Sequence, residues 1–152
     1  MMTQVIKDII TWLKQWFYDK DEIDSMISGG GSTVEEKSIT VTSPTSGTNY
    51  FSGGTREITA IKWGKVVYVY VNFYNVGAKA GSTSTDTTIG TLPTGWHPKR
   101  ELRIRPAINN NSNIQYAQMS VASSGDIKIR VGSTTAITGA TFRGAITFIA
   151  GD

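Results

Sequence analysis

The period of hydrophobic and polar positions changes once along this chain, close to residue 28. Up to Phe17, apolar residues recur every three or four positions, as in an amphipathic α-helix. Beyond residue 37, apolar and polar residues alternate instead, as in half-buried β-strands. We therefore expect three parts: a helical stalk over residues 1–28, a glycine-rich linker over 29–37 and an all-β head over 38–152.

The stalk is expected to consist of two short helices. Apolar residues of the first are spaced 4, 3 and 4 apart, which is the pattern of helices packed side by side. Asp19 and Glu22 form a capping box that starts the second helix. Helices this short need a partner for their apolar stripe, so the stalk is interpreted as a coiled coil between copies of the chain. The expected interface positions are Ile6, Ile10, Leu13, Phe17, Ile23 and Ile27.

A membrane-surface helix is the other interpretation of the stripe, encouraged by Trp12 and Trp16. Residues 1–28 carry 3 basic and 5 acidic residues, a net charge of −2, which is unfavourable at an anionic membrane. Membrane insertion is therefore not expected, and no segment has the ~20 apolar residues of a bilayer span. The run Gly29-Gly30-Gly31 disfavours regular structure and is interpreted as a flexible link, with a cloning scar as the alternative.

The head has its clearest strand at residues 66–74. Val67, Val69, Val71 and Phe73 share one face, which is expected to meet the core. The opposite face carries Tyr68 and Tyr70, and it is expected to contact either a neighbouring subunit or a second packing layer. About eight short strands without intervening helices predict a mainly β, jelly-roll-like antiparallel sandwich. The other strands are expected at 38–42, 57–63, 87–91, 101–107, 114–121, 126–131 and 141–149.

The sequence carries few groups for catalysis. It has no cysteine and one histidine, so a thiolate nucleophile and a conventional zinc site are excluded. The acidic residues of the head are scattered, and no P-loop or dinucleotide motif is present. We therefore expect no enzyme activity, cofactor or metal. Residues 29–152, the linker and head together, carry 12 basic and 7 acidic residues, a net charge of +5, which is too little to predict a nucleic-acid partner.

Several stretches, in order, resemble a known class of proteins. Residues 18–24 look like the short helical motif upstream of head domains in bacteriophage tail-fibre and baseplate proteins, and three later stretches are similar to the heads themselves. One is Ile89–Pro98, which contains the most specific element, Leu-Pro-x-Gly-aromatic-x-Pro at Leu92–Pro98. The others are Ile61-Lys-Trp-Gly-Lys-Val-Val-Tyr-Val69 and Ser124-Gly-Asp-Ile-Lys-Ile129, followed by a final strand ending near Phe148.

This resemblance implies a homotrimer that binds a receptor or saccharide on a host cell. It also implies a protein made in the host cytoplasm and carried in the virion beside other tail or baseplate proteins. A purely structural decoration or collar protein remains an alternative from another class. A polysaccharide depolymerase is a further alternative, and it would need a carboxylate pair that sequence does not reveal.

Candidate ligand-binding residues fall into two groups. Aromatic and amide groups suited to sugars occur at Trp96, His97, Asn109, Asn110, Asn111, Asn113 and Tyr116. The asparagine run is equally explained as a hairpin tip, and His97 as a structural or surface histidine. Arg103 and Arg105 share one strand face, as do Lys128 and Arg130. If the strands are neighbours, these cations form a basic stripe for phosphate or carboxylate groups; the alternative is a solvated face that protects sheet edges.

Overall fold

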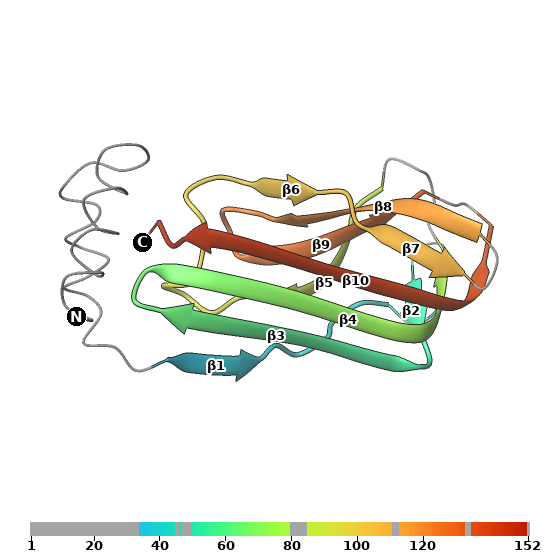
Figure 1. Cartoon of the computed structure of the whole chain (residues 1–152), viewed down its shortest axis with the longest axis horizontal. Helices are drawn as coiled ribbons and strands as arrows, with labels where there is room; N and C mark the ends of the chain where they lie inside the picture. Colours follow the sequence, from blue (N-terminus) through green and yellow to red (C-terminus); the bar gives the residue numbers. More distant parts are fainter. Residues whose placement is uncertain are drawn as a thin grey trace, which may run out of the picture.

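The computed structural model describes residues 34–44, 46, 50–79, 85–110, 113–132 and 135–151, and all regular elements among them are strands (Figure 1). The expected helices and the glycine run lie outside these residues. The strands are β1 (Glu35–Ser38), β2 (Tyr50–Ser52), β3 (Thr55–Trp63), β4 (Val66–Lys79), β5 (Thr87–Thr91), β6 (Leu102–Ile104), β7 (Ala107–Asn110), β8 (Asn113–Val121), β9 (Asp126–Val131) and β10 (Ile137–Ile149).

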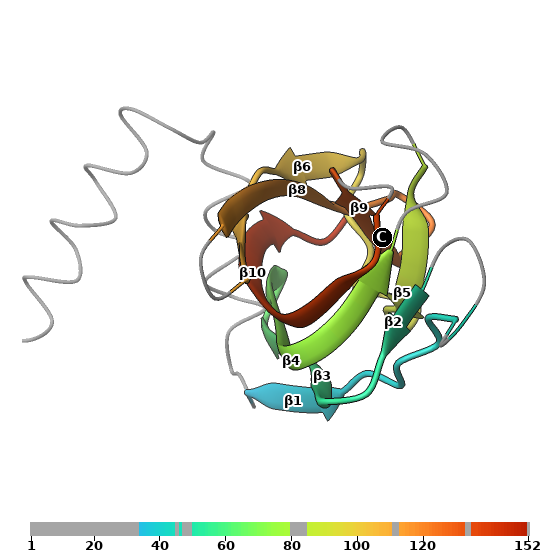
Figure 2. The ribbon, with the colours of Figure 1, turned by 90° about the vertical axis from the view of Figure 1, so that its right-hand side faces the viewer.

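The described strands pair in one continuous path, in the order β1-β3-β4-β10-β7-β8-β9-β5, with β2 beside β4 and β6 beside β8. All of these pairings are antiparallel, which confirms the predicted mainly β, antiparallel class. The sheet curls on itself, as the end-on view in Figure 2 shows. Residues 39–42 connect its two ends, because Ile39 N–H donates to Ile58 O (2.8 Å) and Thr42 N–H donates to Ile89 O (2.9 Å).

The core lies inside this curled sheet. Val67, Val69, Val71 and Phe73 of β4 are fully buried, as their alternation predicts. Phe73 lies opposite Phe142 of β10 and meets Phe51 of β2 edge-on, with ring centroids 5.3 Å apart. Each such side chain contributes about 1.5–3 kcal/mol through burial, so β4 and β10 provide the centre of the head.

The alternation of β4 shifts by one residue at Tyr74-Asn75. Both residues are exposed, and the buried positions continue at Val76 and Ala78. Asn75 has φ 56°, and the pairing with β10 changes register between Ala140 and Phe142. This is a β-bulge, which the sequence analysis did not predict. It allows β4 to turn inward again and pair with β2.

The segment expected as one strand over 101–107 is two strands. β6 pairs with β8 alone, whereas β7 pairs with both β8 and β10. Pro106 lies between them and has no N–H for a ladder, although its carbonyl accepts from Ala117 N–H (3.0 Å). Other bounds also differ from expectation. The first strand, expected at 38–42, begins at Glu35 inside the expected linker and ends at Ser38; β4 continues to Lys79, β10 begins at Ile137, and β2 was not predicted.

Candidate functional site

Trp96 is part of the core rather than an open platform. Its side chain is 3% exposed, and its backbone N–H donates to Pro93 O (3.1 Å). The ammonium groups of Lys37 and Lys62 lie 5.3 and 5.7 Å from the centroid of its indole ring, which is a favourable cation–π geometry. A sugar would have to displace these neighbours to stack on this ring.

His97 joins three segments of the head. Its Nε2 lies 3.0 Å from Leu92 O, and because a carbonyl only accepts, Nε2 carries the proton. The His97 carbonyl accepts from Gly151 N–H (2.8 Å). Gly125, with φ +87°, packs so closely on the imidazole that a Cβ there would clash with it. The half-buried histidine therefore ties the Leu92–Pro98 element to the β8–β9 turn and to the residue after Ala150.

The asparagine-rich segment forms the tip of the β7–β8 hairpin. Asn110 pairs with Asn113, and Asn109 is exposed. Ala107 lies opposite Tyr116 in the same hairpin. Asn111 and the side chains of Asn110, Asn113 and Tyr116 lie outside the described part of the structure. The hairpin expectation is confirmed for the backbone, and sugar binding by these groups stays a prediction.

The predicted basic stripe is separated by β8. Arg103 of β6 lies opposite Ser120 of β8, and Ser120 lies opposite Lys128 of β9. Arg130 lies opposite Gln118 in the next row. Ser120 is 1% exposed, so long side chains cover the middle strand. We call this outer surface of β6, β8, β9 and β5 the charged face.

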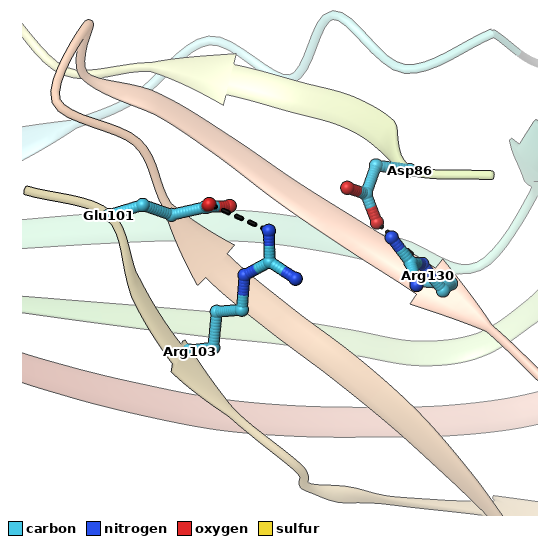
Figure 3. A network of polar contacts seen from close by, with 4 residues as sticks. All are labelled: Asp86, Glu101, Arg103 and Arg130. Atoms are coloured by element: carbon cyan, nitrogen blue, oxygen red, sulfur yellow. Dashed lines mark hydrogen bonds and ion pairs between the residues drawn. The ribbon is translucent and has the colours of Figure 1, made fainter. Parts of the chain in front are cut away.

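Carboxylates compensate two of the cations on the charged face. Arg103 Nη2 lies 2.7 Å from Glu101 Oε2, and Arg130 Nε lies 2.8 Å from Asp86 Oδ1 (Figure 3). The hydrogen bond from Arg103 is the main reason why the pKa of Glu101 is below its usual value, and Ser120 and Lys128 also contribute. Arg105 is exposed beyond the end of β6. The charged face is therefore a mixture of both signs.

The outer surface of β3, β4 and β10 is aromatic. Trp63 is 59% exposed, Tyr74 53% and Tyr68 37%, while Tyr70 is half-buried. The cross-strand register places Ile61 beside Tyr68. We call this surface the aromatic face. The described residues add no second layer over it.

One polar row crosses the aromatic face. Asn72 Nδ2 donates to Glu57 Oε2 (3.3 Å), and Arg143 Nε donates to Asn72 Oδ1 (3.2 Å). This row joins β3, β4 and β10, with Tyr74 on one side of it and Tyr70, Tyr68 and Trp63 on the other. A partner packing on the face would therefore meet apolar area interrupted by one oriented polar chain.

Comparisons with known proteins identify the architecture. No protein-family model matches the sequence, and a search of curated proteins found no match. The head domain of the lactococcal phage bIL170 superposes with a TM-score of 0.57 at 16% identity, covering 78% of this chain and 99% of that domain. The receptor-binding protein gp15 of Listeria phage PSA gives a TM-score of 0.53 at 20% identity, covering 99% of this chain and 76% of gp15. The fold is that of the head domains of phage receptor-binding proteins.

A third similarity is weaker. The head domain of the porcine adenovirus type 4 fibre gives a TM-score of 0.40 at 11% identity.

Among the described residues, no helix is long and apolar enough to span a membrane. No group of three or more His, Cys, Asp or Glu side chains is arranged to hold a metal ion in that same part of the chain.

Proposed function

We propose that this chain is a receptor-binding protein of a phage-like virion, whose head binds a saccharide on the host cell surface. The observation that carries the proposal is the shared fold. Nearly all of the bIL170 head domain superposes on this chain, and nearly all of this chain superposes on the Listeria phage receptor-binding protein. In this role the protein is part of the tail fibre or baseplate and contacts other tail proteins.

We further propose that the protein acts as a homotrimer. Two features support this state. The helical stripe predicted for residues 1–28 needs partner helices, and the aromatic face presents Trp63, Tyr68 and Tyr74 to solvent. Tyrosine and tryptophan are enriched in the buried centres of protein interfaces because they combine apolar area with a polar atom. The aromatic face is therefore the expected contact between heads.

The proposed role is binding without catalysis. A glycosidase acid needs a raised pKa so that it is protonated near neutral pH. The pKa of Glu101 is instead lowered by Arg103. Other described carboxylates of the head also accept structural bonds: Asp86 from Arg130, Asp126 from Ser124 and Thr91, and Glu57 from Asn72. These partners favour a structural use of the carboxylates.

Binding to envelope material tests this proposal. Purified, folded protein is incubated with cell-envelope fractions from a panel of bacteria, with and without periodate oxidation of the vicinal diols of sugars. We expect binding to a subset of the fractions and loss of that binding after oxidation. A decoration or collar protein would bind none of them, and a protein receptor would survive the oxidation. Release of reducing ends during incubation would reveal a depolymerase and contradict the non-catalytic proposal.

A further inference from the structure

We propose that the head has an anion-binding pocket beside β1, which takes the charged group of a negatively charged sugar. The inference rests on the proposed function for its biological meaning, because it assigns a site and a ligand class to receptor binding. The geometry of the pocket does not depend on that role. The pocket has a volume of about 340 Å³ and lies between residues 37–42 and the end of β5. It is lined by Lys37, Ser38, Ile39, Thr40, Thr42, Thr91 and Pro93.

The walls of this pocket are held in place by the main chain. Ile39 and Thr42 donate backbone hydrogen bonds to β3 and β5 respectively. Gly90 lies behind the wall, where a Cβ would come within 3.0 Å of the side chain of Ile39 and 3.2 Å of Thr40 O. Packing this close leaves little room for the wall to move. The pocket is therefore preformed, which lowers the ordering cost of binding.

The pocket is lined by hydroxyl groups that are available to a ligand. Ser38, Thr40 and Thr42 are exposed, and within the described residues their side chains form no hydrogen bonds. Thr91 Oγ1 donates to Asp126 Oδ1 (3.1 Å), so it offers its lone pairs only. Hydroxyls both donate and accept, as sugar hydroxyls do. Ile39 and Pro93 add apolar surface for the carbon skeleton of a sugar.

Lys37 is the only charged side chain among the residues that line the pocket, so the lining itself favours a negative charge. Both Lys37 and Lys62 lie within 6 Å of the centre of the Trp96 ring, and the Asp126 carboxylate lies beside the pocket, where it accepts from Thr91. Lys62 Nζ donates to Gly95 O (2.6 Å), but neither lysine forms an ion pair among the described residues. Glu35 lies opposite Lys62 in the β1–β3 register, with an exposed side chain.

The charged face provides the contrast. Its Arg103 and Arg130 are already compensated by Glu101 and Asp86, whereas Lys37 lies over the Trp96 ring and forms no ion pair among the described residues. Phosphate and carboxylate groups can both bind an ammonium group. The expected ligand is therefore a sugar that carries one of these two anionic groups, and the experiment below distinguishes phosphate from carboxylate.

The test is a titration of the full chain, followed by NMR of backbone amides, with three matched probes: glucose, glucose 6-phosphate and glucuronate. We expect shifts at residues 38–42 and 91 with at least one of the two anions, and binding about tenfold weaker or absent with glucose, because a charged hydrogen bond is lost. The anion that binds more tightly identifies the charged group. Absence of shifts with both anions, equal shifts with glucose, or shifts confined to the charged face would overturn the proposal.

Variants make this test specific. Lys37→Met keeps a long unbranched side chain but removes the charge, so it should weaken anion binding about tenfold or more. Lys37→Arg keeps the charge and should retain binding. Arg103→Met removes a cation from the charged face and should leave binding unchanged. Thermal unfolding confirms that each variant is folded, and Thr42→Val supplies a second pocket variant if Lys37→Met fails to fold. Equal binding by wild type, Lys37→Met and Thr42→Val would contradict the pocket.

Envelope binding separates this inference from the proposed function. If the wild-type protein binds envelopes and Lys37→Met binds them equally well, the pocket assignment is wrong and the receptor-binding role stands. If no envelope is bound while the charged sugar still titrates residues 38–42, the pocket stands and the receptor-binding role fails. Loss of both anion and envelope binding in Lys37→Met is the expected result.

Discussion

The aromatic face and the charged face are two outer surfaces of one curled sheet, but they use different chemistry. On the aromatic face, Trp63 and Tyr74 leave more than half of their surface exposed. On the charged face, the cations compensate nearby carboxylates and cover the small outer side chain of Ser120. Both faces stand on the same buried core. The inward residues therefore determine the fold, while the outward residues are free to serve different partners.

This difference indicates which surface still needs a partner. Ion pairs on the charged face satisfy much of its polarity within the molecule. Among the described residues, the polar side chains that bond to one another on the aromatic face are those of the Glu57–Asn72–Arg143 row. The exposed rings of this face gain from contact with another apolar surface. We therefore assign self-association to the aromatic face and treat the charged face as its natural control.

The largest effect on stability is expected in the buried core, on which both faces stand. Phe73→Ala removes a fully buried ring that lies against Phe51 and Phe142, and it should lower the free energy of unfolding by about 3–5 kcal/mol. Tyr74→Ala, one residue along on the aromatic face, should cost the dissociated head about 0.5 kcal/mol or less, because this side chain is exposed there. Urea unfolding of the two variants measures the contrast. Equal losses would mean that the core does not lie where the alternation of β4 puts it.

The bulge beside the aromatic face gives the next largest effect. Gly53 and Gly54 both have positive φ, but only at Gly54 would a Cβ collide with the main-chain oxygens of Tyr74 and Asn75. Gly53→Ala should cost about 1–2 kcal/mol from its backbone conformation. Gly54→Ala should cost about 1–3 kcal/mol more, because the bulge must shift. Thermal and urea unfolding of the pair would sharpen the comparison, and a smaller loss at Gly54 would contradict the geometry of the bulge.

Self-association should distinguish the two faces directly. Tyr68→Glu places a carboxylate in the proposed contact between heads, where its desolvation is unfavourable. Sedimentation equilibrium should show that the trimer dissociates at a concentration at least about tenfold higher. Arg103→Glu, the matched change on the charged face, should leave association unchanged. The assignment is wrong if the two variants behave alike, or if wild-type protein is monomeric at micromolar concentration.

The smallest effect concerns pH on the charged face. Because the pKa of Glu101 is lowered in the folded state, its ion pair stabilises the fold at pH above the ordinary value of 4.5 and loses this effect as pH falls through the folded pKa. Glu101→Gln should therefore be slightly less stable than wild type at pH 7, and the difference should vanish in acid. In an Arg103→Gln background the same change should have a smaller effect. Urea unfolding across this pH range checks both statements.

Much of the fold could be predicted because alternation is a local signal. The faces of residues 66–74 and the bounds Thr87–Thr91 and Asp126–Val131 agree with the structure. The bulge at Asn75 was missed because it depends on pairing with β10, which lies far along the chain. The break at Pro106 has a local signal, the missing N–H, that was not used.

The candidate site was less predictable because its chemistry depends on distant partners. Trp96 has a sequence context that suits sugar stacking, yet Lys37 of β1 and Lys62 of β3 cover its ring. Asp86 pairs with Arg130, 44 residues away in the sequence. The balance of charge on the charged face could therefore not be predicted from residues that are neighbours in the sequence. The anion pocket was missed for the same reason, since residues 37–42 meet Thr91 and Pro93 only in the folded head.

The position of β10 has a consequence for how the protein is made. This strand is the last of the described strands, yet it lies between β4 and β7 in the middle of the sheet (Figure 1). A nascent chain therefore carries β4 and β7 with unpaired edges until β10 has left the ribosome, and such edges recruit other strands. The head must complete its fold after synthesis of residue 149, and a chain stopped before β10 should aggregate rather than form a smaller head.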